Sequence, residues 1–156
     1  NMLNAVILIG QSQGSSDIPQ AFLWNMIALE SLLTEQGDKY TDKLPERVEA
    51  FIGWTYSWDA ESGYKTKIVE LYKKRCKFVH DGCRDSISTE DIEFSDHILF
   101  NVLVNIIKHP KIFSSKESLI DFSNKVQAEH LLGLSHKTIR PSTLKYQYRI
   151  RKNKEA

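Results

Sequence analysis

The chain has 156 residues and a mass of 18.0 kDa, a size that favours one domain built around a single hydrophobic core. Hydrophobic residues make up 41% of the sequence and charged residues 26%, which excludes disordered and fibrous proteins. The formal net charge is only +1, so the chain as a whole is not a polycation.

The cysteine content and the apolar runs exclude two further classes of protein. Cys76 and Cys83 are too few for a disulfide scaffold and lack the spacing of zinc ligands, which favours a reducing, cytoplasmic setting. The longest apolar runs, residues 5–9 and 98–107, are far shorter than the roughly 20 residues of a membrane span. No basic region precedes the first run, so no secretory signal is expected, and the Asn before the first Met suggests a domain excised from a longer protein.

The charges are divided unevenly along the chain. Residues 136–156 carry seven basic residues and one acid, a charge of +6. The remaining 135 residues carry fourteen basic and nineteen acidic residues, a charge of −5. Attraction to a polyanion is therefore expected at the C-terminal tail rather than over the body.

The first elements in chain order are an ambiguous segment and two helices. Residues 1–17 are of uncertain structure, because their brief apolar run fits either a strand or a short helix. Asp17 and Pro19 supply an N-cap and an early proline for a first helix over about residues 18–36. A second helix is predicted to begin with Asp42 and Pro45, to end near Tyr56 and to be followed by a loop over residues 58–63. Its inward face comprises Val48, Phe51 and Ile52.

Three more helices complete the prediction. The third covers about residues 64–80 and stops at Gly82. A capping box over residues 88–91 opens the fourth, which ends before Pro110 and is apolar enough to be the central, buried helix. A second capping box, formed by Ser114 with Glu117, opens a fifth helix that ends before Gly133. The inward face of this last helix comprises Leu119, Phe122 and Val126.

The predicted fold class is therefore all-α. We expect an up-and-down bundle of about five helices over residues 18–134, followed by a basic tail over residues 135–156. Polar and apolar residues alternate over residues 145–151 of the tail, which fits either an edge strand or an extended arm that binds nucleic acid.

Arg75 occupies the middle of an apolar stripe on the third predicted helix. At about 100° per residue, five apolar residues fall within about 60° of it: Ile68, Leu71, Tyr72, Phe78 and Val79. A guanidinium in that position is costly unless an anion pairs with it. Glu30 lies on the apolar face of the first helix and is the candidate partner. Such a pair could support a functional site, or it could only fix the register of two helices.

His80 stands at the end of the same helix, where its side chain can face a groove. Five residues of helix place it about 140° from Arg75, so a second copy of the chain would be needed to complete a shared site. An imidazole can accept and donate a proton near neutral pH, as attack by a ribose 2′-hydroxyl requires. The alternative is an ordinary surface or capping histidine.

The segment Arg75-Cys76-Lys77-Phe78-Val79-His80 resembles the R-x4-6-H signature of HEPN domains, a family of RNA-cutting and RNA-binding helical bundles. The run Ala-Leu-Glu-Ser-Leu-Leu at residues 28–33, with the Leu-Tyr-Lys-x-Arg run that leads into His-x-Gly, is similar to the Apea-like branch of prokaryotic proteins. This resemblance covers about residues 18–110 and implies a HEPN-like bundle.

The resemblance also implies a function and partners. Two copies would form a homodimer whose paired Arg75 and His80 segments make a metal-independent endoribonuclease, acting in stress response or phage defence. His80 would act as base or acid, Arg75 would neutralise phosphate charge, and Glu30 would support Arg75. The substrate would be RNA, because the reaction needs a 2′-hydroxyl. A neighbouring domain or an antitoxin-type protein would be a further partner, and no cofactor is expected.

Six basic residues are expected to attract the RNA backbone: Lys73, Lys74, Lys77, Lys145, Arg149 and Arg151. The three lysines fit an ordinary solvated helix face equally well. Many active HEPN members carry a polar residue after the arginine, whereas this chain has Cys76. This departure favours an alternative, a non-catalytic HEPN module for dimerisation or RNA sensing within a larger protein. A plain helical interaction domain is the third reading, and no metal site is expected, because the histidines lie on separate elements.

Deletion of residues 145–151 tests the interpretation of the tail as an RNA arm. We expect the deletion to lower RNA affinity and to reduce its dependence on salt, because fewer phosphates would be neutralised. Fluorescence anisotropy at two salt concentrations would measure both effects, with circular dichroism as the control for folding. Undiminished binding would remove the tail from the RNA-binding surface.

Overall fold

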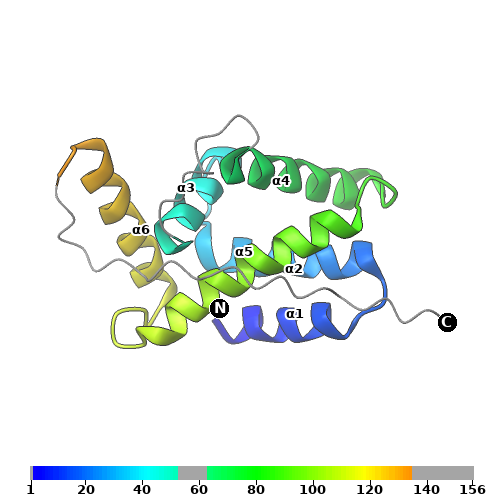
Figure 1. Cartoon of the computed structure of the whole chain (residues 1–156), viewed down its shortest axis with the longest axis horizontal. Helices are drawn as coiled ribbons and strands as arrows, with labels where there is room; N and C mark the ends of the chain where they lie inside the picture. The colour runs from blue at the N-terminus through cyan, green and yellow to red at the C-terminus, as the bar shows by residue number, and fades with distance from the viewer. Residues whose placement is uncertain (1, 53–62, 135–156) are drawn as a thin grey trace.

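The computed structural model describes residues 2–52 and 63–134, and the regular structure in these ranges is α-helical (Figure 1). Six helices follow one another: α1 (Met2–Gly14), α2 (Ile18–Leu33), α3 (Tyr40–Ile52), α4 (Tyr64–Asp81), α5 (Thr89–Lys108) and α6 (Lys116–Leu131). The all-α class is confirmed. The described ranges contain one helix more than the five expected, because the ambiguous N-terminal segment is helical. The helix end predicted near Tyr56, the tail and all but Gly63 of the predicted loop over residues 58–63 lie outside the described residues.

Three of the predicted helix ends are confirmed. Asp17 is the N-cap of α2, where its Oδ1 accepts a hydrogen bond from the Gln20 backbone N at 3.1 Å. Gly82 ends α4 in the left-handed conformation with φ of 65°, which glycine adopts without strain. Ser88 and Asp91 form the capping box that opens α5. These ends depend on neighbouring residues alone.

The capping box predicted at the start of the last helix is displaced by one residue. Ser115, and not Ser114, is the N-cap of α6, and its partner in the box is Ser118 rather than Glu117. The Ser115 N–H donates to the Ser118 hydroxyl at 3.1 Å, so a serine occupies the place that glutamate or glutamine usually takes.

The helix that most of the others share is α2. It packs against α1 and α5 and also contacts α3, α4 and α6 (Figure 1). The prediction gave the central position to α5, which packs against α2 and α3 and contributes many buried side chains, but Phe100 and Ile107 leave one side of α5 exposed. An apolar sequence pattern shows that a helix can be buried on every side, but not that other helices cover every side.

The largest buried side chains come from several helices and form one core: Phe22, Met26, Leu29, Leu33, Leu44, Phe51, Ile68, Ile92, Ile98, Leu99 and Leu119. Phe51 of α3 contacts Phe113 and Phe122, with ring centroids 5.3 Å and 5.1 Å away. These tilted aromatic contacts join α3 to α6 and to the loop before it.

A buried arginine fixes the connection between α2 and α3. Arg47 has a side chain only 5% exposed and donates to the Leu33 carbonyl at 2.7 Å and to Asp38 Oδ2 at 2.6 Å. The Leu33 carbonyl belongs to the last residue of α2, so Arg47 satisfies one of the free acceptors at that helix end. The interaction is both an ion pair and a helix cap.

Replacing Arg47 with Leu should destabilise the protein by about 3 kcal/mol, because Asp38 would be left partly buried without its counter-charge. Arg84→Leu is the matched control, because Arg84 pairs with Asp17 in an arrangement about half exposed, and exposed ion pairs contribute little to stability. Urea unfolding measures both. Equal losses in the two variants would contradict the structural role of Arg47.

Candidate functional site

The predicted pair between Glu30 and Arg75 is present. The Arg75 Nη2 donates to Glu30 Oε2 at 2.9 Å, which joins α4 to α2. Glu30 is 9% exposed, and the side chain of Arg75 is 21% exposed. Each charge lies on an otherwise apolar face, and the pair provides the partner that burial of either one requires.

Arg75 lies on the covered side of α4, as predicted, but the cover over this side becomes thinner after Leu71. Ile68 and Leu71 are buried, as expected, but Tyr72 and Phe78 are only partly covered and Val79 is exposed. The last two turns of α4 are therefore only partly covered by neighbouring helices. Part of the guanidinium remains accessible from outside.

Burial and charge act in opposite directions on Glu30. Burial raises the pKa of its carboxyl above the ordinary value, while the positive charge of Arg75 and its hydrogen bond lower it. Glu30 Oε1 and Arg75 Nε are both buried and have no hydrogen-bond partner. The pair is therefore held by a single hydrogen bond rather than by the bidentate contact that arginine can make.

Two tyrosines beside the pair were missed by the sequence analysis as members of the site. The rings of Tyr40 and Tyr72 lie 5.6 Å apart between α3 and α4. Burial, followed by a hydrogen bond with Cys76, raises the pKa of Tyr72 to about 12, so its phenol is neutral at physiological pH. Tyr72 lies on the same side of the helix as Arg75, but the sequence analysis counted it as an apolar residue of the stripe because of its ring and did not consider its hydroxyl.

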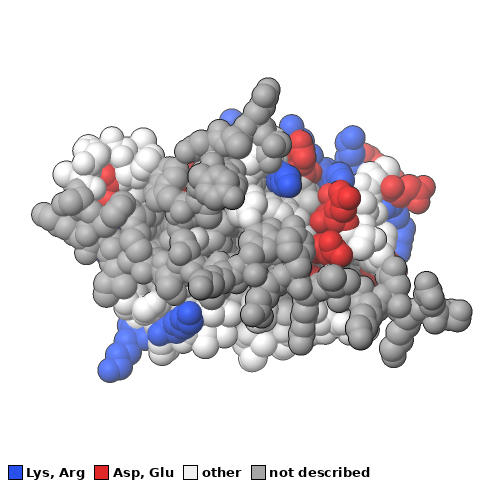
Figure 2. Space-filling model, in the orientation of Figure 1, with Lys and Arg blue, Asp and Glu red and all other residues white. Residues whose placement is uncertain are grey.

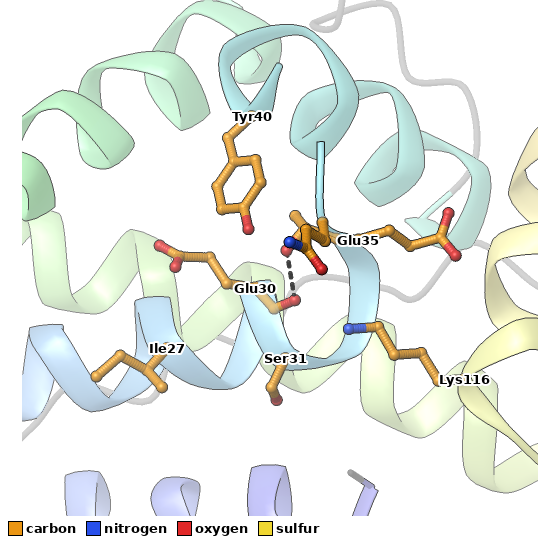
Figure 3. A pocket seen from close by; sticks show the side chains of 8 residues that line it. Ile27, Glu30, Ser31, Glu35, Tyr40 and Lys116 are labelled. Carbon is orange, nitrogen blue, oxygen red and sulfur yellow. Dashed lines mark hydrogen bonds between the residues drawn. The ribbon is translucent and has the colours of Figure 1, made fainter. Parts of the chain in front are cut away.

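A shallow hollow of about 390 Å³ lies next to the pair (Figure 3). Glu30 and Ile27 line one side of it, and Lys116 of α6 reaches in from the opposite side. The hydroxyl of Tyr40 points into the space between them, whereas the carboxylate of Glu35 turns away. The hollow is therefore lined by acidic and basic side chains and by a tyrosine hydroxyl.

His80 lies apart from the pair. It is exposed in the last turn of α4 and has no hydrogen-bond or ion-pair partner among the described residues. Asp81 and Asp85 nearby in the chain are exposed as well, and Arg84 is paired with Asp17. Since Arg75 faces α2 and His80 faces solvent, one copy of the chain does not bring the two side chains together.

The predicted RNA-binding lysines of α4 differ from one another. Lys73 and Lys77 are exposed, but Lys74 forms an ion pair with Asp91 at 2.6 Å and so reinforces the cap of α5. Around the end of α4 and the start of α5, Figure 2 shows acidic groups next to basic ones among the described residues. The surface there is mixed in charge. The tail residues Lys145, Arg149 and Arg151 lie outside the described part of the chain.

The remaining polar residues of interest are packed inside the bundle. Burial lowers the pKa of His97 to about 4, so this histidine is neutral, and its ring Nδ1 lies 3.1 Å from Asn101 Nδ2. Asn105 donates to the Phe51 carbonyl at 2.7 Å. In residues 2–52 and 63–134, no three His, Cys, Asp or Glu side chains are grouped as metal ligands. No helix in these ranges is long and apolar enough to cross a membrane.

No protein-family model, curated protein or solved structure matches the chain. The resemblance to HEPN domains therefore depends on the residues that carry the motif, and above all on Arg75 and His80.

Replacing Arg75 with Met should destabilise the protein at pH 7 by about 2 kcal/mol, less than for fully buried pairs because Arg75 is partly exposed. The loss should be smaller at pH 5. Without Arg75, the pKa of Glu30 in the folded protein rises further above its value in the unfolded chain. A carboxyl group with such a raised pKa favours folding at low pH, when it is protonated, and this contribution is lost as the pH rises. Urea unfolding at both pH values measures this dependence. In the double variant with Glu30→Gln, most of the stability should return, and equal losses at both pH values would contradict the assignment.

Proposed function

We propose that the chain is a HEPN-type RNA-binding domain that acts as a homodimer and cleaves RNA without a metal ion, with Arg75 and His80 as its catalytic residues. The observation that carries the proposal is the arrangement on α4. Glu30 holds a partly exposed Arg75 on this helix, and an exposed histidine stands in the last turn five residues later.

The proposed reaction is a transfer of the phosphate from the 5′-oxygen to the 2′-oxygen. One His80 removes the proton of the 2′-hydroxyl, whose oxygen then attacks the phosphorus. The bond from phosphorus to the 5′-oxygen breaks, and the leaving oxygen takes a proton from a protonated His80 on the second copy. The products are a 2′,3′-cyclic phosphate and a free 5′-hydroxyl. Two histidines are needed, which is why the proposal includes a homodimer.

Arg75 would stabilise the charge that develops on the phosphate. A guanidinium has five N–H donors, and Glu30 uses one of those on Arg75. The exposed part of the side chain leaves donors free to meet a phosphate oxygen. Glu30 would then act as a positioning residue, because it fixes the direction of the guanidinium without touching RNA.

Affinity for RNA would come from a few basic residues rather than from the whole surface. Lys73 and Lys77 project from the exposed side of α4, and the tail contributes its charge of +6. Acidic residues around His80 would confine RNA to a narrow path. In this proposal the domain works in the cytoplasm of a prokaryote, in stress response or phage defence.

A non-catalytic HEPN module is the second candidate. It is favoured by the ion pair of Arg75 with Glu30, because this pair already uses part of the charge that catalysis needs. It is also favoured by Cys76, which stands where many active HEPN members carry a polar residue and which forms a hydrogen bond with Tyr72. Asp81 next to His80 also disfavours approach of a phosphate. This candidate keeps the dimer and the RNA binding but excludes cleavage.

Cleavage of a labelled single-stranded RNA in the presence of EDTA separates the two candidates. The wild type should cleave, whereas His80→Ala and Arg75→Ala should each lose at least about a hundredfold in rate, because general acid–base catalysis contributes about 10² to 10⁴. Lys67→Ala on the same helix is a control, since Lys67 contacts the ring of Phe94. Circular dichroism must show each variant folded. A folded wild type that binds several RNAs but cleaves none would exclude the nuclease and leave the second candidate.

A further inference from the structure

The outer side of α1 is uncharged. None of the thirteen residues of this helix is Asp, Glu, Lys or Arg, although these four types make up 26% of the chain. A helix on the surface of a soluble bundle normally turns charged residues outward, and a helix that is apolar on both sides is normally covered. Along the edge where Figure 1 places α1, the described atoms that are visible in Figure 2 are mainly white.

The side of α1 that faces the bundle is narrow. Ala5 and Ser12 are completely buried, and α1 packs closely on α2. On the opposite side Leu3 is 71% exposed and Ile7 is 50% exposed, with Val6 exposed next to them. Other large apolar residues of α1 are partly buried against the core, but these three face outward, where a surface helix usually carries polar side chains.

Four residues form one straight stripe on the outer side. At about 100° per residue, Leu3, Ile7, Gly10 and Gly14 all fall within a sector of about 60° centred opposite Ala5 and Ser12. Their spacing of four, three and four residues is that of helices which pair along their length. The N-terminal half of the stripe carries the large side chains of Leu3 and Ile7, whereas the C-terminal half consists of Gly10 and Gly14, which have no side chains.

The described part of the chain does not explain the two glycines of the stripe. Glycine inside a helix is less stable than alanine, and neither Gly10 nor Gly14 has a positive φ. A Cβ atom at either position would have no heavy atom within 4 Å. The two glycines therefore permit no close contact among residues 2–52 and 63–134, but they leave room for a helix that approaches from outside.

We propose that α1 is an interface at which a second copy of the chain binds, with the two α1 helices antiparallel. A two-fold axis between residues 8 and 9 places Ile7 of each copy over Gly10 of the other and Leu3 over Gly14. The bulky half of each helix then fills the space above the glycine half of its partner. A parallel pair would set aliphatic residues against each other and leave a gap along the glycines.

The lack of charge favours a second copy over other occupants. A nucleic acid needs basic residues, and helices that lie on membrane surfaces usually carry Lys and Arg on their polar side. A charged peptide would find no counter-charge on α1. A second α1 offers an equally uncharged surface with the complementary shape.

The expected size of the interface predicts a reversible dimer. A helix of 13 residues is about 20 Å long, so two α1 helices bury less than the roughly 800 Å² per partner of a standard interface. The exposed Phe100 and Ile107 of α5 can add to it, because the hydrogen bond from Gln13 to Asp96 places α5 beside α1. This surface is separate from α4, so it can be correct whether or not the domain cleaves RNA.

Sedimentation velocity of the full chain over a concentration series tests the proposal. The average mass of the wild type should rise with concentration toward that of a dimer, or beyond it where copies also pair through α4. Ile7→Glu should raise the dissociation constant of the α1 contact by about tenfold or more, because it places a charge in an uncharged contact. Leu131→Glu is the matched control, since Leu131 is an 81% exposed leucine at the end of α6. A wild type that stays monomeric, or an Ile7→Glu variant that dimerises as the wild type does, would overturn the proposal.

Gly10→Leu separates docking from folding. The added side chain should raise the thermal stability of the dilute monomer, because leucine is a better helix former than glycine and a Cβ atom at this position meets no heavy atom of the described residues within 4 Å. It should also weaken the dimer, because it fills the space meant for Ile7 of the second copy. A variant that dimerises as tightly as the wild type would show that α1 is not the interface. His80→Ala should leave dimerisation through α1 unchanged while it abolishes the proposed cleavage.

Discussion

A carboxylate on the helix that the others share constrains where α4 can lie. Glu30 belongs to α2, and almost all of its surface is covered. A charge in that position needs an opposite charge close by, and Arg75 supplies it. The ion pair therefore links α4 to α2 and favours the rotation of α4 that turns Arg75 toward Glu30. The exposure of the last turn of α4, and of His80 within it, follows from that placement.

The other buried polar groups have similar roles in the remaining contacts. Asn25 of α2 donates to Ser95 and to Asp96 of α5, at 3.0 Å and 2.6 Å, and Gln13 of α1 donates to the same carboxylate at 2.9 Å. Three helices thus share one small network. Apolar packing alone would permit several rotations of these helices, whereas directional hydrogen bonds favour one of them.

Arg75 connects the stability of the bundle with the proposed chemistry. The contact with Glu30 orients the guanidinium, but the same contact uses part of its charge. Because part of Arg75 is accessible, the residue can have a catalytic role in a nuclease as well as a structural role in the bundle. The choice between them depends on whether a second copy brings another His80 close enough, which the geometry of one chain does not provide. Pairing through α1 and pairing through α4 are separate questions, because the two helices present surfaces of opposite character, one uncharged and one of mixed charge.

The sequence by itself determined the features that depend on neighbouring residues. The all-α class, the caps at Asp17 and Ser88 and the stop at Gly82 follow from hydrogen bonds within a few residues. The pair of Glu30 with Arg75 was also predictable, because a single opposite charge stood in each of two apolar stripes. Tertiary structure decided which stripes are covered: it made a helix of residues 2–14, left Val79 and Phe100 exposed and bound Lys74 to Asp91. The reason is physical: backbone hydrogen bonds in a helix are local, whereas burial depends on segments far apart in the chain.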